Sequence, residues 1–266
     1  MKLQETADHI TNWLKDYALH AGVKGFVVGV SGGIDSALTS TLCALTGLDV
    51  LTLEMPIHQN PLQASLGKEH QEWLKKHFSN TTHRSIELTG VYDHFVAAMQ
   101  PGGADHELSL ANTRARLRMS TLYYHGQANG LLVAGTGNKV EDFGVGFYTK
   151  YGDGGVDLSP IADLYKTEVF NIARELGIVD GILTAKPTDG LWGDDRTDED
   201  QLGATYPELE WAMTQNEAGK KAIDFKGREA EVMVIYNRFH TANTHKMRPI
   251  PVCQIPEELK LRSSLV

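Results

Sequence analysis

Short apolar runs alternate with longer segments of helical periodicity along the first half of the chain. Runs of strand length are expected at 26–30, 50–53, 83–88 and 130–134. Apolar residues recur at helical spacing over 3–20, 36–45, 91–99 and 107–128, and a further helix is expected through Trp73 and Leu74. This alternation predicts an α/β fold in which a doubly wound parallel sheet is flanked by helices, with right-handed crossovers.

The first expected strand runs directly into the string Ser31-Gly32-Gly33-Ile34-Asp35-Ser36. Adjacent glycines can adopt positive φ, which lets successive N–H groups point at one site, and a helix start adds further unpaired N–H groups. Together they favour an anion, most often phosphate. Asp35 would repel a phosphate unless a cation lay between them, so Mg²⁺ is implied. A plain strand-to-helix turn is the simpler interpretation of a lone glycine pair.

A second glycine turn, Gly135-Thr136-Gly137, follows the fourth expected strand. Ligands of parallel sheets bind beyond the carboxyl ends of the strands, so both turns are expected on one edge of the sheet. Glu141 can then supply a second carboxylate to the ion held by Asp35. The glycine-rich segment 148–157 can bring backbone close to a ligand, or it can be an ordinary surface turn.

The length of 266 residues fits a single domain, expected to carry mobile loops near 57–68 and 189–204. The segment 57–68 is polar and is expected to be a loop. The acidic segment 189–200 is expected to be a solvated loop, the alternative being a lid that orders over a bound nucleotide.

Composition narrows the choice of partners and location. A net charge of −9 without a dense basic run weighs against a nucleic-acid partner. The two cysteines, Cys43 and Cys253, lack C-x-x-C partners, so neither a zinc site nor a disulfide framework is expected, and Cys43 is expected in the core. The apolar runs are too short for a membrane span, and the first residues lack an apolar signal core. The expected location is the cytoplasm.

The string Ser-Gly-Gly-Ile-Asp-Ser resembles the signature of the PP-loop ATP pyrophosphatases, which split ATP between its α- and β-phosphates. With GFYTKYGDGGVDLSP at 146–160, the chain from about Gly29 to Lys246 resembles the ammonia-dependent NAD synthetases, whose fold is Rossmann-like (adenine nucleotide alpha-hydrolase-like). The resemblance implies a ligase that forms a C–N bond. ATP would adenylate the nicotinate carboxylate of deamido-NAD, releasing pyrophosphate, and ammonia would then displace AMP to give NAD.

The resemblance also implies roles for individual residues. Asp35 and Glu141 would hold Mg²⁺ and carry catalysis. The expected ATP-binding residues are Gly29, Val30, Ser31, Gly32, Gly33, Ile34, Asp35, Ser36, Thr136, Lys166 and Thr188. The expected contacts of the dinucleotide substrate are Arg116, Lys150, Asp157, His245 and Lys246. The family is homodimeric, and the helix expected at 107–128, apolar on more than one side, is a candidate interface element.

Two features leave the mechanism open. Glu54 stands where short bacterial members commonly have arginine, so no adenine contact is expected there. No general base for ammonium is evident; Asp157 is one candidate, and lone histidines such as His58, His94 and His106 are weaker ones.

Other functions stay open at this stage. They are a GMP-synthetase-like amidation, transfer-RNA thiolation and a nucleotide-binding sensor, because a fold does not determine a function. Thiolation usually needs catalytic cysteines and a basic face. About 25 residues precede the first strand, which leaves no room for a glutaminase module with its nucleophilic cysteine. Free ammonia is therefore the expected donor, unless a separate glutaminase subunit supplies it.

Overall fold

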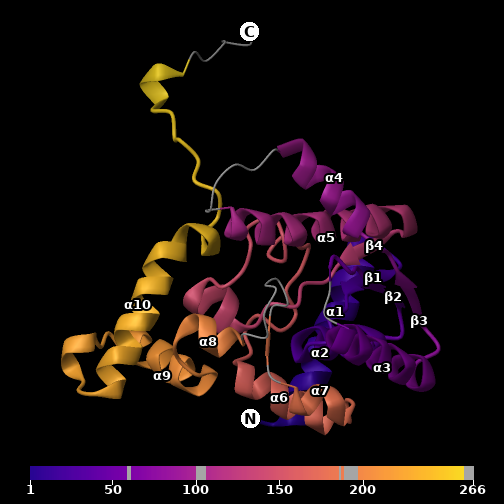
Figure 1. Ribbon diagram of the computed structural model, residues 1–266, viewed down its shortest axis with the longest axis horizontal. Helices are drawn as coiled ribbons and strands as arrows, with labels where there is room; N and C mark the ends of the chain where they lie inside the picture. Colours follow the sequence, from indigo (N-terminus) through magenta and orange to yellow (C-terminus); the bar gives the residue numbers. More distant parts are fainter. Residues whose placement is uncertain (59–60, 100–105, 186, 189–196, 261–266) are drawn as a thin grey trace.

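A four-stranded parallel sheet with helices on both faces forms one side of the molecule (Figure 1). This computed structural model describes residues 1–58, 61–99, 106–185, 187–188 and 197–260, with only the backbone at 61–64. The strand order is β3-β2-β1-β4. The strands are β1 (Gly25–Gly29), β2 (Asp49–Glu54), β3 (Thr81–Ser85) and β4 (Leu131–Val133). The α-helices are α1 (Leu3–Ala21), α2 (Ile34–Leu45), α3 (Pro61–His77), α4 (Thr89–Met99), α5 (Glu107–Asn129), α6 (Lys166–Glu175), α7 (Asp180–Thr184), α8 (Asp198–Leu202), α9 (Tyr206–Glu217) and α10 (Arg228–Met247). One π-helix, η1 (Val140–Val145), and two 3₁₀ turns, η2 (Ala222–Asp224) and η3 (Glu257–Leu259), complete the described elements.

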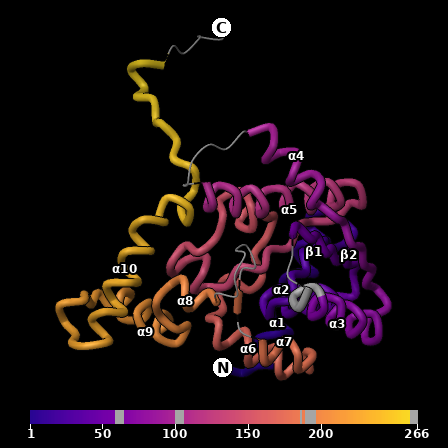
Figure 2. The backbone as a smooth tube through the Cα atoms, viewed as in Figure 1, coloured from indigo at the N-terminus to yellow at the C-terminus, as the bar shows by residue number. Residues whose placement is uncertain are grey.

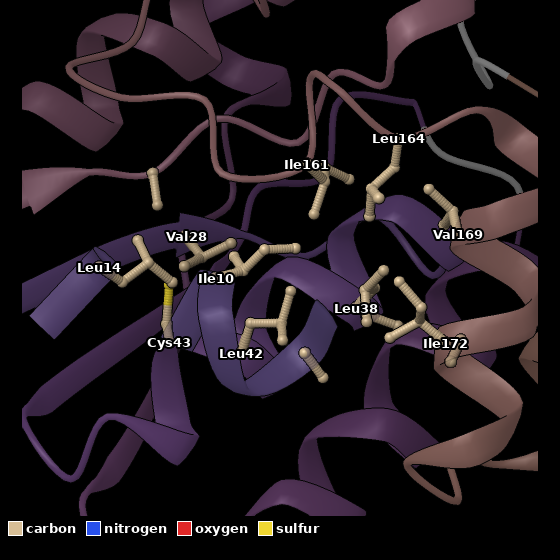
Figure 3. Close-up of a cluster of buried hydrophobic side chains, with 14 of the residues drawn as sticks. Ile10, Leu14, Val28, Leu38, Leu42, Cys43, Ile161, Leu164, Val169 and Ile172 are labelled. Carbon is tan, nitrogen blue, oxygen red and sulfur yellow. The ribbon is translucent and has the colours of Figure 1, made fainter. Parts of the chain in front are cut away.

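Strands β1, β2 and β4 are largely buried on both faces of the sheet, and neighbouring residues of one strand point to opposite faces. Phe26 and Val28 of β1 pack with α1, α2 and α6, whereas Val27 packs with residues of α4 and α5. Figure 3 shows the first of these clusters, in which Cys43 lies as expected, and burial raises the pKa of its thiol. Burial on two faces explains why these strands are continuous apolar runs rather than alternating ones.

The expected loop at 57–68 is wrong from residue 61 onward, because α3 begins at Pro61. Proline suits the first position of a helix, where its missing N–H needs no partner. The segment is polar since α3 buries only one side: Leu66 packs against the core, and His70 and Leu74 are buried. Whether this segment is mobile stays a prediction, and residues 189–196 of the other expected loop lie outside the described residues.

The third strand was expected at 83–88 and instead spans Thr81–Ser85. It pairs with β2 from Val50↔Thr81 to Glu54↔Ser85, so it ends where its partner ends. Its side chains are exposed or half-buried, because β3 is an edge strand that is held mainly by its backbone hydrogen bonds to β2. Apolar periodicity therefore indicated this strand but could not fix its bounds.

A helical cluster formed by η1, α8, α9 and α10 has its own core. Helices α8, α9 and α10 lie on the side of the molecule away from the strands (Figures 1 and 2), and α9 contacts α6. The helices of this cluster contact each other closely because two positions of the η1 segment lack side chains. A Cβ on Gly144 would lie 2.6 Å from the sulfur of Met213 in α9, and one on Gly146 would lie 2.4 Å from Cβ of Asn243 in α10. No helix among the described residues has the length and apolar character needed to cross a bilayer.

The strand order creates a topological switch point at β1. The chain leaves β1 for β2 on one side and returns through α5 to β4 on the other side. The loops that follow β1 and β4 therefore open at the same edge of the sheet, where ligands of such folds bind.

Candidate functional site

The loop after β1 has the backbone of an anion site. Gly32 has a φ of +88°, and Gly33 is the N-cap of α2. The hydroxyl of Ser36 accepts a hydrogen bond from the N–H of Ser31 (3.2 Å) and donates one to the carbonyl of Gly33 (2.9 Å), which fixes the loop. A small pocket lies against this loop, lined by Ser31, Gly32, Gly33, Ile34, Leu66, Ile182, Ala185, Pro187 and Thr188. The expected phosphate loop and Thr188 are thus brought together.

Asp35 and Glu141, which follow different strands, meet at one ammonium group. Nζ of Lys166 lies 2.5 Å from Oδ2 of Asp35 and 3.0 Å from Oε1 of Glu141. Lys166 is the first residue of α6 and its side chain is 3% exposed, whereas each carboxylate side chain is 16% exposed. Three residues expected in the site are therefore in direct contact, with their charges withdrawn from solvent.

Asn138 belongs to the site, although the sequence singled out only its neighbours. Its side-chain amide donates to Oδ1 of Asp35 (3.1 Å), and its carbonyl oxygen accepts from the N–H groups of Val140 and Glu141 (3.1 and 3.2 Å). Asn138 thereby starts η1 and aligns both carboxylates. Its position in the segment 135–141, directly after the fourth expected strand, indicated that Asn138 lies near the site. Nothing in that segment indicated that its amide would be buried.

Tyr206 of α9 completes the surroundings of the ammonium. Its hydroxyl lies 2.6 Å from Oε1 of Glu141 and 3.2 Å from Oδ2 of Asp198, and its ring centroid lies 4.7 Å from Nζ of Lys166. A ring at this distance attracts a cation. Tyr206 is far from Glu141 in sequence, so no local pattern could have identified it.

Burial and charge pairing oppose each other in this network. Burial raises the pKa of Asp35 more strongly than Lys166 lowers it. Burial also acts to raise the pKa of Glu141, but the charge of Lys166 and hydrogen bonds from Tyr206 outweigh it, so the pKa of Glu141 is lowered. Burial acts to lower the pKa of Lys166, yet the two carboxylates raise it above its usual value. The ammonium is therefore held charged.

The donor set fits Mg²⁺. Both carboxylates reach a single Nζ, so their oxygens converge on a place that one cation can fill, and Mg²⁺ prefers oxygen ligands. Within the described ranges, no group of three or more His, Cys, Asp or Glu side chains forms a complete metal cage. Mg²⁺ is commonly bound by one or two carboxylates together with substrate phosphates, which matches this arrangement.

A second pocket opens behind the loop that follows β4. It is lined by Gly135, Gly137, Asp142, Phe143, Tyr148, Asp153, Gly154, Val156, Ser159, Lys246 and Met247. Lys246 hydrogen-bonds the carbonyls of Gly146 and Tyr148, which ties α10 to the glycine-rich segment. Thr136 lies between two of the lining glycines. Burial, followed by the charge of Glu141, raises the pKa of Asp142 to about 8.

The residues expected to contact the dinucleotide divide into two groups. Arg116 donates to the carbonyl of Lys150 (3.3 Å), and Nζ of Lys150 donates to the carbonyl of His245 (3.1 Å), so these three lie in a chain beside Lys246. Asp157 instead accepts hydrogen bonds from the hydroxyl of Tyr123 (3.0 Å) and the N–H of Val133 (2.8 Å). In this structure Asp157 supports the end of β4.

A cation does reach the region of Glu54, although not from that position. Nε of Arg118 in α5 donates to the carbonyl of Met55, next to Glu54, at 3.0 Å. Burial, followed by the nearby charge of Arg114, lowers the pKa of Arg118 to about 10. Of the weaker candidates for a general base, His58 pairs with Asp93 (2.8 Å).

Known proteins resemble this chain over nearly its full length. The NAD synthase family profile matches residues 6–250. The NH(3)-dependent NAD(+) synthetase of Methanosarcina mazei is 39% identical over 96% of this chain and all of that protein. Among solved structures, an NMN synthetase from Francisella tularensis has a TM-score of 0.82 and 32% identity, covering 97% of this chain and 99% of the other. The NH3-dependent NAD synthetase of Campylobacter jejuni has a TM-score of 0.77 and 25% identity, covering 96% and 100%. The chain belongs to the NH3-dependent NAD(+) synthetase family.

Proposed function

We propose that this ligase activates the nicotinate carboxylate of deamido-NAD with ATP and then amidates it with ammonia. A carboxylate oxygen attacks the α-phosphorus, the bond to the bridging oxygen of the β-phosphate breaks, and pyrophosphate leaves with the electron pair. Ammonia then adds to the activated carbonyl carbon, AMP leaves, and the nitrogen gives up a proton. The observation that carries this proposal is the meeting of Asp35, Glu141 and Lys166 beside the glycine loop of β1.

The residues of this edge suit the first step. The N–H groups of the loop 31–36 that are not used within it, together with the start of α2, would bind phosphate. Gly29, Val30, Thr136 and Thr188 would lie around it, and Lys166 would contact a phosphate oxygen. Bound between Asp35 and Glu141, Mg²⁺ would withdraw charge from the departing pyrophosphate. Positioning and electrostatics of this kind are the main requirement of phosphate chemistry.

The second pocket would take the acceptor substrate. Gly135 and Gly137, which line this pocket, belong to the loop after β4, at the same sheet edge as the phosphate loop after β1. Lys246 also lines the pocket. Arg116, Lys150 and His245 lie in the chain of hydrogen bonds that leads to it and would contact the substrate's phosphates. The place of Asp157 against Val133 favours an indirect role in shaping this pocket.

A mononucleotide acceptor is a second candidate for the same site. It is favoured by the likeness to the NMN synthetase of Francisella tularensis, which extends over nearly the whole chain. Nicotinate mononucleotide presents the same carboxylate and one phosphate, so the chemistry of activation and amidation would be unchanged. The two acceptors differ only in whether an adenylate half must also be bound.

We also propose that the protein is a homodimer that works in the cytoplasm. Support for the dimer comes from apolar side chains that α4 and α5 leave exposed, namely Val91, Phe95, Met99, Leu108 and Tyr124. Support for the location is the need for ATP and a nicotinate nucleotide in one compartment.

The test is product formation from ATP, Mg²⁺ and either acceptor, with ammonium or glutamine as nitrogen donor. NAD and AMP in equal amounts with deamido-NAD and ammonium are expected, with little product from glutamine. A much higher kcat/KM with nicotinate mononucleotide would select the second candidate. Asp35→Ala should abolish turnover with either acceptor while the fold is retained by circular dichroism. Full activity in that variant would remove metal positioning from the proposal.

A further inference from the structure

Lys166 holds the position between the two carboxylates that the proposed function assigns to a metal ion. Its Nζ is in hydrogen-bond contact with Asp35 and Glu141 at 2.5 and 3.0 Å, and its side chain is 3% exposed. Two carboxylates and one ammonium leave a net charge of −1 in a buried place. The Lys166 ammonium therefore already neutralises half of the carboxylate charge that would attract a metal ion.

We propose that Lys166 and the divalent cation compete for Asp35 and Glu141, so that the cation is bound only together with a nucleotide. The proposal rests on the assignment of these carboxylates to the metal. A divalent cation that bound the same oxygens would lie against the ammonium, and like charges in contact repel strongly where water is excluded. Nζ must therefore leave both carboxylates before the cation can take them.

A phosphate group provides the alternative partner that Lys166 needs. Asp35 lies in the first turn of α2, whose N-terminus and preceding glycine loop form the anion site. An anion bound there lies next to Asp35, so the ammonium can exchange a carboxylate for a phosphate without entering solvent. Without such an anion, displaced Lys166 would be a buried, unpaired charge, which is costly.

The ring of Tyr206 keeps the ammonium near the site during this exchange. Its centroid is 4.7 Å from Nζ, and this attraction does not depend on either carboxylate. The two events that follow are coupled: the nucleotide takes Lys166, and the carboxylates become available to the cation. The coupling makes cation binding depend on nucleotide binding, and by linkage the reverse also holds.

The experiment measures Mn²⁺ binding to the full chain by the loss of the free-ion electron paramagnetic resonance signal. Wild type is expected to bind Mn²⁺ weakly alone, and wild type with α,β-methylene-ATP is expected to bind it at least about tenfold more tightly than either the protein or the nucleotide does alone. Lys166→Met should bind Mn²⁺ alone at least about tenfold more tightly than wild type. Lys139→Met is the matched control, since Lys139 pairs with Asp163 and lies over Tyr165, outside the carboxylate pair. It should bind like wild type.

Several results would overturn the proposal. Equal or weaker Mn²⁺ binding by Lys166→Met than by wild type contradicts competition, and an equal gain in Lys139→Met reduces the effect to net charge. If Lys166→Met does not fold, the wild-type measurement tests the proposal: Mn²⁺ binding by wild type with α,β-methylene-ATP that is no tighter than binding by the nucleotide alone excludes exchange. Unchanged nucleotide-dependent Mn²⁺ binding in both Asp35→Asn and Glu141→Gln would instead overturn the metal assignment, which separates the two failures.

Discussion

Asn138 ties the two carboxylates of the site to one stretch of backbone. Its amide N–H group donates to Asp35, and its carbonyl oxygen accepts from the backbone N–H that carries Glu141. The residue is fully buried, where a polar side chain is tolerated only if its hydrogen bonds are satisfied. Asn138 therefore fixes the separation of the two carboxylates. Burial acts to raise the pKa of both carboxyl groups, Lys166 acts to lower it, and a hydrogen bond from Tyr206 acts to lower that of Glu141.

The hydroxyl of Tyr206 is predicted to contribute to catalysis by aligning Glu141. Tyr206→Phe keeps the ring under Lys166 but removes the 2.6 Å hydrogen bond to Glu141. A hydrogen bond to a charged group contributes about 1.5–3 kcal/mol, so kcat/KM should fall roughly tenfold or more. Steady-state kinetics and the apparent Mg²⁺ requirement test this. Tyr236→Phe, also buried in the helical cluster, should keep wild-type kinetics. Equal losses in the two variants would show that Tyr206 is only structural.

His70 predicts a pH dependence of stability. It is buried with Nε2 2.9 Å from the hydroxyl of Ser40, and burial lowers its pKa from 6.5 to about 4. Between these values the unfolded chain binds a proton that the folded chain does not, so stability falls as the pH drops from 6.5 towards 4. The full effect is about 3 kcal/mol. Urea unfolding across this range should show a smaller loss for His70→Gln than for wild type. An unchanged slope would contradict the prediction.

At the scale of elements, strand β1 depends on a close approach between neighbouring backbones. Gly25 pairs with Asp49 of β2, and a Cβ on Gly25 would lie 1.9 Å from the Asp49 carbonyl oxygen. At the other end of β1, a Cβ on Gly29 would lie 3.3 Å from the flexible end of Met55 and at ordinary contact distance, 3.6 Å or more, from Leu122. The two glycines of one strand therefore have different reasons to be present.

Gly25→Ala should cost far more stability than Gly29→Ala. The first must push apart two paired strands and is expected to lower the free energy of unfolding by about 3 kcal/mol, whereas the second should cost less than about 1 kcal/mol. Chemical denaturation of both variants measures the difference. Similar free energies of unfolding for the two variants would show that β1 and β2 can shift enough at Gly25 to accept a Cβ and stay paired.

The elements differ in how far the sequence could predict them. Strands β1 and β2 and helices α2 and α5 are apolar or periodic enough to be located, and the α/β fold, the family and the ligase function are confirmed. The edge strand β3 was expected but with shifted bounds, and the first turns of α3 were missed, because backbone pairing and a proline helix start leave little hydrophobic pattern. Within the site, a local motif indicated Asp35, but the contacts of Tyr206 depend on tertiary packing.

For the whole molecule, the exposed apolar side chains of α4 and α5 bear on assembly. Leu108 is 63% exposed and Tyr124 is 71% exposed in α5, a helix whose other side covers the sheet. Apolar patches of this kind commonly mark interaction sites. A second copy of the chain is the partner proposed for this surface.

Sedimentation at micromolar concentration should show a dimer. Leu108→Asp would place a charge in the interface and should weaken the dimer by at least about tenfold, because a buried unpaired charge is costly. Ile223→Asp is the matched control, because Ile223 is an apolar residue that is 90% exposed in η2, outside α4 and α5. It should leave the sedimentation coefficient unchanged. A monomeric wild type that retains activity would contradict the dimer.

The separation of the site residues along the chain has a consequence for protein synthesis. Asp35 follows β1, Glu141 follows β4, and Lys166 lies 131 positions beyond Asp35. A nascent chain on the ribosome therefore completes the glycine loop early and the opposing charges much later. Products that end before Glu141 lack one of the two carboxylates, and those that end before Lys166 lack the ammonium, so neither would assemble the site. Only a chain that extends past Lys166 can bring the three charged groups together.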